Sequence, residues 1–533
     1  MGEASAQARG IVAAGHPETA AAGRALLEAG GNAFDAVLGG ICAAMVCEPL
    51  LISLAGGGFL MARPAGAEPE LFDFFVQTPA RRRPAAEIDF HPIDADFGTA
   101  TQEFHVGLGS AAVPGMAAGV VEAHAALGRL PLGEVLAPAI ALARRGVEIT
   151  SYQARVSNIL RCILALSPEA MALVATEEAP ARPATAGERV RNRDLADTFV
   201  QLAKLGRAGF YEGDFADRLV DACRADGGQL THEDLRAYRV LRRAPVRTRA
   251  FGADIWLNAP PSPGGSLVAF ALALLEAIPL SEWAWDSPEA RLAVARAMDA
   301  ANRLRAQMES EDYERALAGV LNDDARMAEW RAHALPGDLF SRGTTHISVA
   351  DADGNLASLT ASNGEGCGFV VPGSGVMMNN MLGEQDLNPG GFHRWAPGAR
   401  LASMMCPTLA RLADGSEIAC GTGGSNRIRG AVLQVLLNLC AFGMPLERAI
   451  TSPRLHVEGA RLSFETGLDD AAAAALMQAW PVHEAWPDLS LFFGGVHAVR
   501  RWPAAPAGAR DGGGAFGGAG DPRRGGAVAR AEA

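Results

Sequence analysis

The stretch from Gly343 to Asn363 reads GTTHISVADADGNLASLTASN and decides the fold. On both sides of Asp353-Gly354, a dipeptide favoured in tight type I′ hairpin turns, apolar residues alternate with small or polar ones. The pattern predicts two antiparallel strands joined by a short turn. Thr344 would stand at the first residue of the first strand, where the chain is held rigidly.

Thr344 is a candidate nucleophile. A threonine hydroxyl is weakly nucleophilic unless a base lies beside it, and a free α-amine on the same residue supplies one. An internal threonine has no free amine, so this chemistry requires the chain to cut itself between Gly343 and Thr344. The alternative is that Thr344-Thr345 merely starts a strand, since β-branched residues favour sheets. We interpret His346 as a strand residue, because the amine already fills the role of the base.

A second candidate element, CGTGGSNRIRGAVLQVLLNLC, runs from Cys420 to Cys440. Its glycines predict a turn with exposed backbone N–H groups, and apolar residues then recur at helical spacing. A turn of this kind before a helix can bind a phosphate or the oxyanion of an acyl-transfer intermediate. The usual phosphate-loop and dinucleotide signatures are missing. A plain strand-to-helix turn is the alternative interpretation.

Together these segments resemble the γ-glutamyltranspeptidase family, whose motifs follow one another in the same order over nearly the whole chain. They are AAGHPETAAAGRALLEAGGNAFDA near the start, the triplet Gly56 to Gly58, VPGMAAG from Val113, GTTHISVADADGN, NNMLGE from Asn379, SMMCPT from Ser403, GTGGS from Gly421 and the closing GAGDPRRGG. The resemblance implies an α+β fold, the four-layer αββα sandwich of N-terminal-nucleophile hydrolases. Self-cleavage would yield a large chain, residues 1–343, and a small catalytic chain, residues 344–533, in one interleaved sandwich.

At the reacting end of the site, the resemblance implies a complete set of groups. Thr344 matches the family's nucleophile, and Ser362 matches a second hydroxyl bonded to it. Gly423 and Gly424 match the amides of the oxyanion hole.

At the substrate end, the resemblance implies three polar contacts. Glu384 matches the acidic residue that holds the substrate's α-amino group. Ser403 matches the first of two serines that contact the α-carboxylate. Asn363, after an alignment slip of one residue, is a candidate polar contact.

Three departures from the family pattern remove polarity from the substrate end. Phe75, in LFDFFVQTPARRR, stands where the family has the arginine that binds the α-carboxylate, Met404 replaces the second serine, and Met381 replaces a polar residue. The arginines at 81, 82 and 83 are a possible replacement cation, although we interpret them as a solvated charge run. The reaction type is therefore better supported than the substrate.

The resemblance implies a self-processing zymogen that hydrolyses or transfers γ-glutamyl amides, as in glutathione metabolism, through a γ-glutamyl ester on Thr344. One alternative is an amidase or acylase of the same fold for a non-glutamyl acyl amide. Another is an inactive binding protein. The expected partners are a small amide substrate and the two chains of the precursor itself, and we expect no cofactor and no metal. The eight cysteines contain no C-x-x-C pair, and buried free thiols are the default.

Composition agrees with an enzyme of this kind. The chain has 533 residues, 49% of them hydrophobic, which is enough for a large core. A formal charge of -13 argues against nucleic-acid binding. No stretch reaches the length of a membrane span, so no membrane contact is expected. The first residues lack the apolar run of a signal peptide, and the expected location is cytoplasmic.

The remaining segments give coarser predictions. Residues 17–28 and 33–47 read as helices, 59–63 and 71–75 as strands, and 116–144 as mostly helical. The segment from 168 to 191, rich in Ala, Pro and Glu, predicts a surface excursion. Residues 286–329 predict a long helical region with an exposed charged face. The Gly-rich end of the chain is expected to be partly ordered at DPRRGG.

Overall fold

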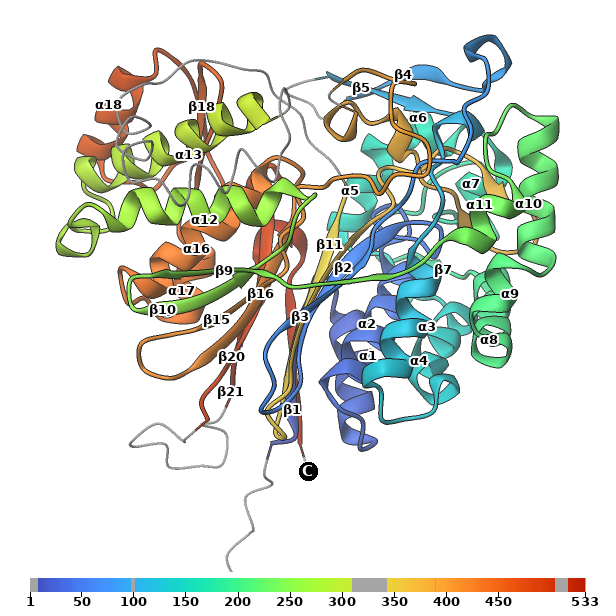
Figure 1. Cartoon of the computed structure of the whole chain (residues 1–533), viewed down its shortest axis with the longest axis horizontal. Coiled ribbons are helices and arrows are strands. Elements are labelled where there is room, and N and C mark those ends of the chain that lie inside the picture. Colours follow the sequence, from blue (N-terminus) through green and yellow to red (C-terminus); the bar gives the residue numbers. More distant parts are fainter. Residues whose placement is uncertain (1–7, 97–100, 309–342, 389, 504–515, 533) are drawn as a thin grey trace, which may run out of the picture.

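The computed structural model describes residues 8–96, 101–308, 343–388, 390–503 and 516–532. Its centre is a pair of sheets packed face to face (Figure 1). The first sheet has seven strands, in the spatial order β22 (Ala527–Ala531), β1 (Gly10–Ala14), β11 (Thr345–Asp351), β12 (Leu356–Ser362), β2 (Gly57–Arg63), β3 (Glu70–Phe74) and β8 (Leu241–Arg243). All neighbouring pairs in it are antiparallel.

The second sheet has six strands and is also antiparallel. Their spatial order is β21 (Phe516–Ala519), β20 (Gly495–Arg501), β16 (Glu417–Gly423), β15 (Thr408–Arg411), β10 (Ala253–Leu257) and β9 (Val246–Ala250). Each sheet therefore takes strands from both sides of the bond between residues 343 and 344. Neither side contains a complete sheet.

Helices cover the outer face of each sheet (Figure 1). The first sheet is covered by α1 (Pro17–Glu28), α2 (Ala33–Cys47) and α3 (Met116–Leu127), with α4 (Leu132–Arg145) packed on α2 beyond them. The second is covered by α12 (Pro263–Glu276), α16 (Arg427–Cys440) and α17 (Leu446–Thr451), with α13 (Pro288–Met308) beyond them. The layers are helix, sheet, sheet, helix, which confirms the predicted α+β αββα sandwich.

Smaller elements surround these layers. The additional strands are β4 (His91–Asp96), β5 (Thr101–Val106), β6 (Val147–Glu148), β7 (Arg189–Val190), β13 (Val370–Val371), β14 (Val376–Met377), β17 (Leu455–Glu458), β18 (Arg461–Glu465) and β19 (Val482–Trp486). The additional helices are α5 (Ser151–Ile159), α6 (Arg161–Leu164), α7 (Pro168–Ala172), α8 (Arg193–Leu205), α9 (Arg207–Tyr211), α10 (Asp214–Ala225), α11 (His232–Ala237) and α18 (Asp470–Ala479). None of the described helices is long and apolar enough to cross a bilayer.

A charged cluster joins the two sheets at one end of their interface. Arg63 on β2 makes two hydrogen bonds to the Glu417 carboxylate on β16, of 2.6 and 2.8 Å, and Arg501 on β20 adds a third of 2.9 Å. Arg63 and Glu417 are 7% and 5% exposed. Because the geometry is bidentate and the pair is buried, this contact fixes how the sheets lie on each other.

The helix predictions at the start of the chain are confirmed, since α1 and α2 begin and end where the sequence predicted. Asn32 caps α2 by accepting hydrogen bonds from the N–H groups of Phe34 and Asp35, and the Asp35 side chain accepts one from Asn32 in return. This reciprocal cap is a strong start signal. The predicted strands and the helical region from 116 to 144 are also present, the latter divided into α3 and α4.

Two predictions about exposure are wrong in part. In the segment 168–191, α7 and the residues after it bury Met171, Leu173 and Val174 in a small separate core, whereas residues 177–182 and 185–189 are mostly exposed. The second concerns α13, whose predicted exposed face is largely buried, including Arg291 and Asp299. The part of that prediction from 309 to 329 lies outside the described residues.

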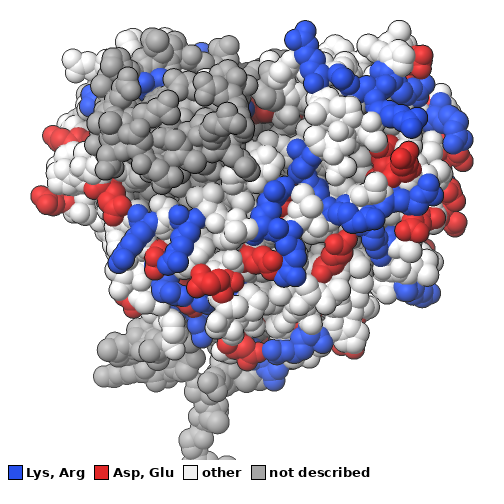
Figure 2. Space-filling model, in the orientation of Figure 1, with Lys and Arg blue, Asp and Glu red and all other residues white. Residues whose placement is uncertain are grey.

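Charges of both signs are interspersed on the surface. On the face shown in Figure 2, basic and acidic side chains alternate. The arginines near 240 contribute ion pairs between Arg242 and Glu70, and between Arg247 and Asp254 at 3.4 Å. No single-sign field covers this face.

Candidate functional site

The peptide bond between Gly343 and Thr344 lies at the start of β11 and is buried. The Thr344 hydroxyl donates to the carbonyl oxygen of Gly343 at 2.7 Å, and the Ser362 hydroxyl donates to the same oxygen at 2.6 Å. On the other side, the Gly343 N–H donates to Glu365 at 2.8 Å. Two hydroxyls thus donate to one carbonyl oxygen, and the Thr344 hydroxyl lies beside the Gly343–Thr344 peptide bond.

The hairpin of β11 and β12 positions both hydroxyls. Thr345 pairs with Ala361 in its register, which places Ser362 level with Thr344. The Asp351 carboxylate closes the turn by accepting from the Asn355 N–H at 2.9 Å, and it also accepts from the Ala33 N–H at the start of α2, at 2.8 Å. The turn is therefore fixed to the outer helix layer, and the hairpin is rigid.

Ser362 differs in one respect from the prediction. It bonds the Gly343 carbonyl rather than the Thr344 hydroxyl, and it accepts from the Gly364 N–H at 2.9 Å. Both hydroxyls are satisfied by a group of the uncut chain.

Gly423 and Gly424 lie against the same peptide. A Cβ on Gly423 would lie 2.1 Å from the Thr344 carbonyl oxygen, so only glycine allows this approach. Gly424 has a φ of +131°, a conformation open to glycine, and α16 begins a few residues later. The predicted turn before a helix is confirmed, and it lies beside the Thr344 backbone.

A pocket of about 370 Å³ opens in front of Thr344. Its polar lining comprises Thr344, Ser362, Glu384, Asp386, Ser403 and Ser425. Its apolar lining comprises Phe75, Met381, Leu387, Met404, Met405 and Ile428. Five of the eight predicted site residues thus meet in one pocket, whose described lining has two carboxylates and no Lys or Arg.

Three of the four residues expected at the substrate end, Glu384, Ser403 and Phe75, line this pocket. Glu384 is 4% exposed, and Ser403 accepts a hydrogen bond from the Met405 N–H at 3.1 Å. Phe75 is 1% exposed and stacks on Phe59 with ring centroids 5.4 Å apart. The exception is Asn363, whose side chain donates to the Met377 carbonyl at 3.3 Å and does not line the pocket. Its expected role as a substrate contact gains no support here.

The arginines at 81–83 do not replace the missing cation. Arg81 is exposed, Arg82 donates to the His393 carbonyl at 2.7 Å, and Arg83 donates to backbone carbonyls near Gly228. Another buried cation, Arg400, donates to the carbonyl of Phe75 and lies 3.6 Å from Asp73. It holds the Phe75 backbone and does not line the pocket.

Several residues of the site were missed from the sequence. Asp386, two residues beyond Glu384, lines the pocket and accepts from the Ser425 hydroxyl at 3.0 Å. Arg524 belongs to the DPRRGG motif but had no assigned role, and it donates to the Thr344 carbonyl at 3.2 Å. Nothing in the sequence singled out Glu48, which accepts from the Thr345 hydroxyl at 3.0 Å.

Burial shifts the pKa values of ionisable side chains around Thr344. Burial raises the pKa of the Glu48 carboxyl to about 7, and the Thr345 hydroxyl and Arg524 oppose this rise. Burial also lowers the pKa of His346, whose ring nitrogens contact the Thr360 and Ser348 hydroxyls. His346 is therefore a neutral strand residue, as predicted.

The cysteines behave as buried thiols. All eight are free, and burial raises the pKa of Cys406 to about 11. Cys420, on β16, is also buried with a raised pKa. Neither lines the pocket in front of Thr344.

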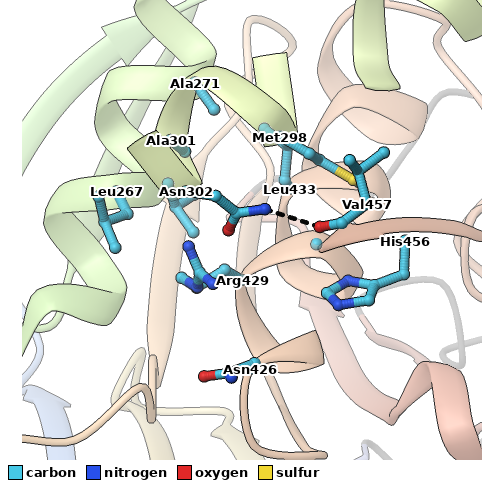
Figure 3. A pocket seen from close by; sticks show the side chains of 12 residues that line it. Leu267, Ala271, Met298, Ala301, Asn302, Asn426, Arg429, Leu433, His456 and Val457 are labelled. Carbon is cyan, nitrogen blue, oxygen red and sulfur yellow. Dashed lines mark hydrogen bonds between the residues drawn. The ribbon is translucent and has the colours of Figure 1, made fainter. Parts of the chain in front are cut away.

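A second pocket lies on the other side of the first turn of α16 (Figure 3). Asn426 and Arg429 line it, whereas Ser425 and Ile428 line the pocket of Thr344. Asn302 crosses it to donate to the Val457 carbonyl at 2.7 Å. None of the predicted site residues lies in this pocket.

Comparisons with known proteins agree with this geometry. Residues 19–531 match the family model described as gamma-glutamyltranspeptidase. The chain is 32% identical over 492 residues to the acylase ACY 1 proenzyme of Pseudomonas sp. (strain V22), covering 88% of this chain and 86% of that one. It is 28% identical over 481 residues to the glutathione hydrolase proenzyme of Bacillus subtilis (strain 168), covering 84% and 80%. The crystal structure of a cephalosporin acylase from Bacillus halodurans superposes with a TM-score of 0.83 at 25% identity, covering 99% and 97%.

Proposed function

This chain belongs to the gamma-glutamyltranspeptidase family, and from that premise we propose that it is a self-processing enzyme that hydrolyses or transfers acyl groups through an ester on Thr344. The observation that carries the proposal is the pair of hydroxyls, from Thr344 and Ser362, on the Gly343 carbonyl oxygen. This arrangement supports attack on the chain's own peptide bond first and on a substrate amide afterwards.

Maturation follows from the geometry of the uncut chain. The Thr344 hydroxyl attacks the Gly343 carbonyl carbon, and the peptide nitrogen leaves as the α-amine of Thr344, so that an ester replaces the amide. Water then hydrolyses this ester, which gives a carboxylate on Gly343 and restores the Thr344 hydroxyl. The Ser362 hydroxyl donates to the oxygen on which negative charge develops.

Catalysis reuses the same atoms on a substrate amide. The new α-amine takes the proton from the Thr344 hydroxyl as that oxygen attacks, and then delivers it to the leaving amine. We assign the backbone N–H groups of Gly423 and Gly424 to the oxyanion, because this turn lies against Thr344. Water resolves the acyl ester in hydrolysis, and an acceptor amine resolves it in transfer.

The first candidate donor is a γ-glutamyl amide, the substrate class of the family. Glu384 is buried in the pocket and suits the donor's ammonium group. Ser403 lies on the same wall and suits one oxygen of the α-carboxylate. The glutathione hydrolase relative agrees with this assignment.

The second candidate is an acyl amide without the α-carboxylate, and the lining of the pocket favours it. Phe75, Met381 and Met404 meet the acyl chain where an arginine and further polar groups are expected in relatives. An ionised carboxylate against a phenyl ring and two thioethers loses its hydration without gaining a hydrogen bond. Two of the relatives are named as acylases, which supports the same candidate.

The first experiment tests self-processing. Wild-type protein should appear as two chains of 343 and, by 533 minus 343, 190 residues. Thr344→Ala should remain a single inactive chain, whereas Thr466→Ala, at an exposed threonine far from the pocket, should be cut normally. Intact-mass measurement gives the cut position directly. Wild-type protein that is active while uncut would exclude this mechanism.

The second experiment identifies the donor with four anilides that differ only at one carbon. They carry γ-glutamyl, 4-aminobutanoyl, glutaryl or butanoyl groups, so that ammonium and carboxylate are present or absent independently. The first candidate predicts the highest kcat/KM for γ-glutamyl, and the second predicts that 4-aminobutanoyl equals or exceeds γ-glutamyl and that both exceed butanoyl. Equal values for all four donors would contradict both assignments.

A further inference from the structure

Arg524 is a buried cation without a carboxylate partner. It is 5% exposed, and among the described residues no carboxylate oxygen lies within 4.0 Å of its guanidinium. Its neighbour Arg523 differs, because Glu465 and Asp521 both pair with it. A buried charge without a counter-ion is costly to keep. The hydrogen bonds that the Arg524 guanidinium makes go to backbone carbonyls, those of Thr344 and Leu491, in the described part of the chain.

Arg524 contacts the backbone of Thr344, and glycines on neighbouring strands make space for it. Its Nη1 donates to the Thr344 carbonyl at 3.2 Å. A Cβ on Gly423 would lie 2.8 Å from that nitrogen, and one on Gly495 would lie 2.6 Å from the Arg524 side chain. Gly423 therefore leaves room for the Arg524 guanidinium, and Gly495 leaves room for its aliphatic stem.

Glu48 is a second buried charged side chain, and it contacts Thr345, the residue after Thr344. It is 4% exposed, no cation lies within 4.0 Å of it in the described part of the chain, and it accepts from the Thr345 hydroxyl. A Cβ on Gly15 would lie 2.9 Å from its Oε1 and 3.3 Å from the Thr345 hydroxyl. Here too a glycine permits the contact.

We propose that Arg524 and Glu48 are a positioning pair that holds the Thr344-Thr345 backbone once the chain has been cut, with the charge of Arg524 beside the new α-amine. The inference rests on the proposed function. Cutting removes the covalent attachment of Thr344 to Gly343, and a fresh strand terminus frays unless other contacts hold it. Arg524 holds the carbonyl of the nucleophile residue, and Glu48 holds the hydroxyl of the next.

The pair also sets the electrostatic environment of the base. The carbonyl and the α-nitrogen belong to one residue, so the guanidinium lies within roughly 7 Å of the amine. At that distance a unit charge shifts a titration by roughly 1–2 pH units. A cation favours the neutral amine that catalysis needs, and an ionised Glu48 opposes it. The other ionisable groups facing this region are Tyr152 on α5, His497 on β20, and Glu365, Glu384 and Asp386 on the pocket side.

The test measures the pH dependence of kcat/KM in cut enzymes, with the best of the four anilides as substrate. Arg524→Met should move the acid limb, the low-pH side of the kcat/KM profile, about one unit to higher pH. Without the nearby positive charge, the pKa of the α-amine rises. Arg524→Lys should leave the limb in place while lowering kcat, since the charge remains but the hydrogen bond is altered. Glu48→Gln should move the limb to lower pH.

Arg291→Met is the matched control. Arg291 is a buried arginine on α13, stacked on Trp285 with its guanidinium carbon 4.6 Å from the ring centroid, and it is remote from Thr344. Its variant should keep the wild-type limb. Limbs that coincide in all four variants would overturn the inference.

Measuring the cut by intact mass separates a failure of this inference from a failure of the proposed function. Cutting and Thr344-dependent turnover in the wild type test the function, and the limbs test the pair. If Arg524→Met stays uncut, Arg524→Lys and Glu48→Gln decide, because their predicted limbs differ from each other.

Discussion

Single side chains line the pocket in which the proposed donor would lie. Glu384 suits an ammonium group there, whereas Phe75 and Met404 offer no hydrogen bond to a carboxylate. A hydrogen bond to a charged group contributes about 1.5–3 kcal/mol, so under the proposed function these two positions should change donor preference by roughly 10- to 100-fold.

Phe75→Arg should therefore raise kcat/KM for the γ-glutamyl anilide relative to the 4-aminobutanoyl anilide by at least about 10-fold, through a new pair with the donor carboxylate. Because Phe75 is buried against Phe59, Met404→Ser serves as a second, milder variant that adds a hydroxyl at the same wall. Its effect should have the same direction and be smaller. An unchanged donor ratio in both variants would show that the carboxylate does not bind at this wall.

At the residue scale, local motifs predicted several side chains that meet in the folded protein. Thr344, Ser362, Glu384 and Ser403 stand in recognisable runs, and the fold brings them to one pocket. Arg524 and Glu48 could not be singled out, because their contacts depend on elements that meet only in the folded sandwich. Asn363 lies in a matching run, but its side chain donates to the Met377 carbonyl and does not line that pocket.

At the element scale, prediction succeeded where caps and turns mark the ends of segments. The Asn32 cap and the Asp353-Gly354 turn act through neighbours in the chain, and the elements they bound were predicted closely. Burial was harder to predict. Arg291 and Asp299 of α13 are buried by packing against other elements, and no periodicity in 288–308 reports that packing.

The contact between β2 and β16 provides a test at this scale. Glu417→Gln should lower stability by about 3–5 kcal/mol, because it leaves Arg63 buried with a weakened partner. Urea unfolding of the uncut Thr344→Ala protein would measure this loss, as the free energy of unfolding obtained from the midpoint and the slope. Asp414→Asn, at an exposed carboxylate paired with Arg500, should lower the free energy of unfolding by less than about 1 kcal/mol. Equal shifts in the two variants would contradict a special role for the inter-sheet pair.

At the scale of the whole molecule, buried histidines make the fold sensitive to acid. Burial lowers the pKa values of His16 and His497 to about 4, and it lowers those of His346 and His456 as well. Between pH 6.5 and 4 the unfolded chain binds these protons and the folded chain does not, so stability falls as pH falls. Glu48, with its pKa raised to about 7, has the opposite effect between pH 7 and 4.5 but offsets only one histidine.

The melting temperature of the Thr344→Ala protein should therefore drop steadily from pH 6.5 to 4.5. His497 alone accounts for roughly 3 kcal/mol over its full range. His497→Asn keeps an acceptor for the Asp521 N–H but cannot gain a proton, so its melting temperature should fall less steeply. A flat profile in the parent protein would contradict the buried, neutral state of these rings.

The pairing of β1 with β22 has a consequence for how the polypeptide can be ordered. Gly10 lies opposite Ala531, and the Arg9 N–H donates to the Ala531 carbonyl at 2.9 Å, so the two ends of the described chain are already neighbours. A short linker can join them, and circular permutation is tolerated where termini lie close together. A permuted gene that starts at Thr344 and ends at Gly343 would then encode a protein whose nucleophile is terminal from synthesis, once the initiator methionine is removed. In such a protein, the reaction with an amide substrate could be measured without any self-cleavage beforehand.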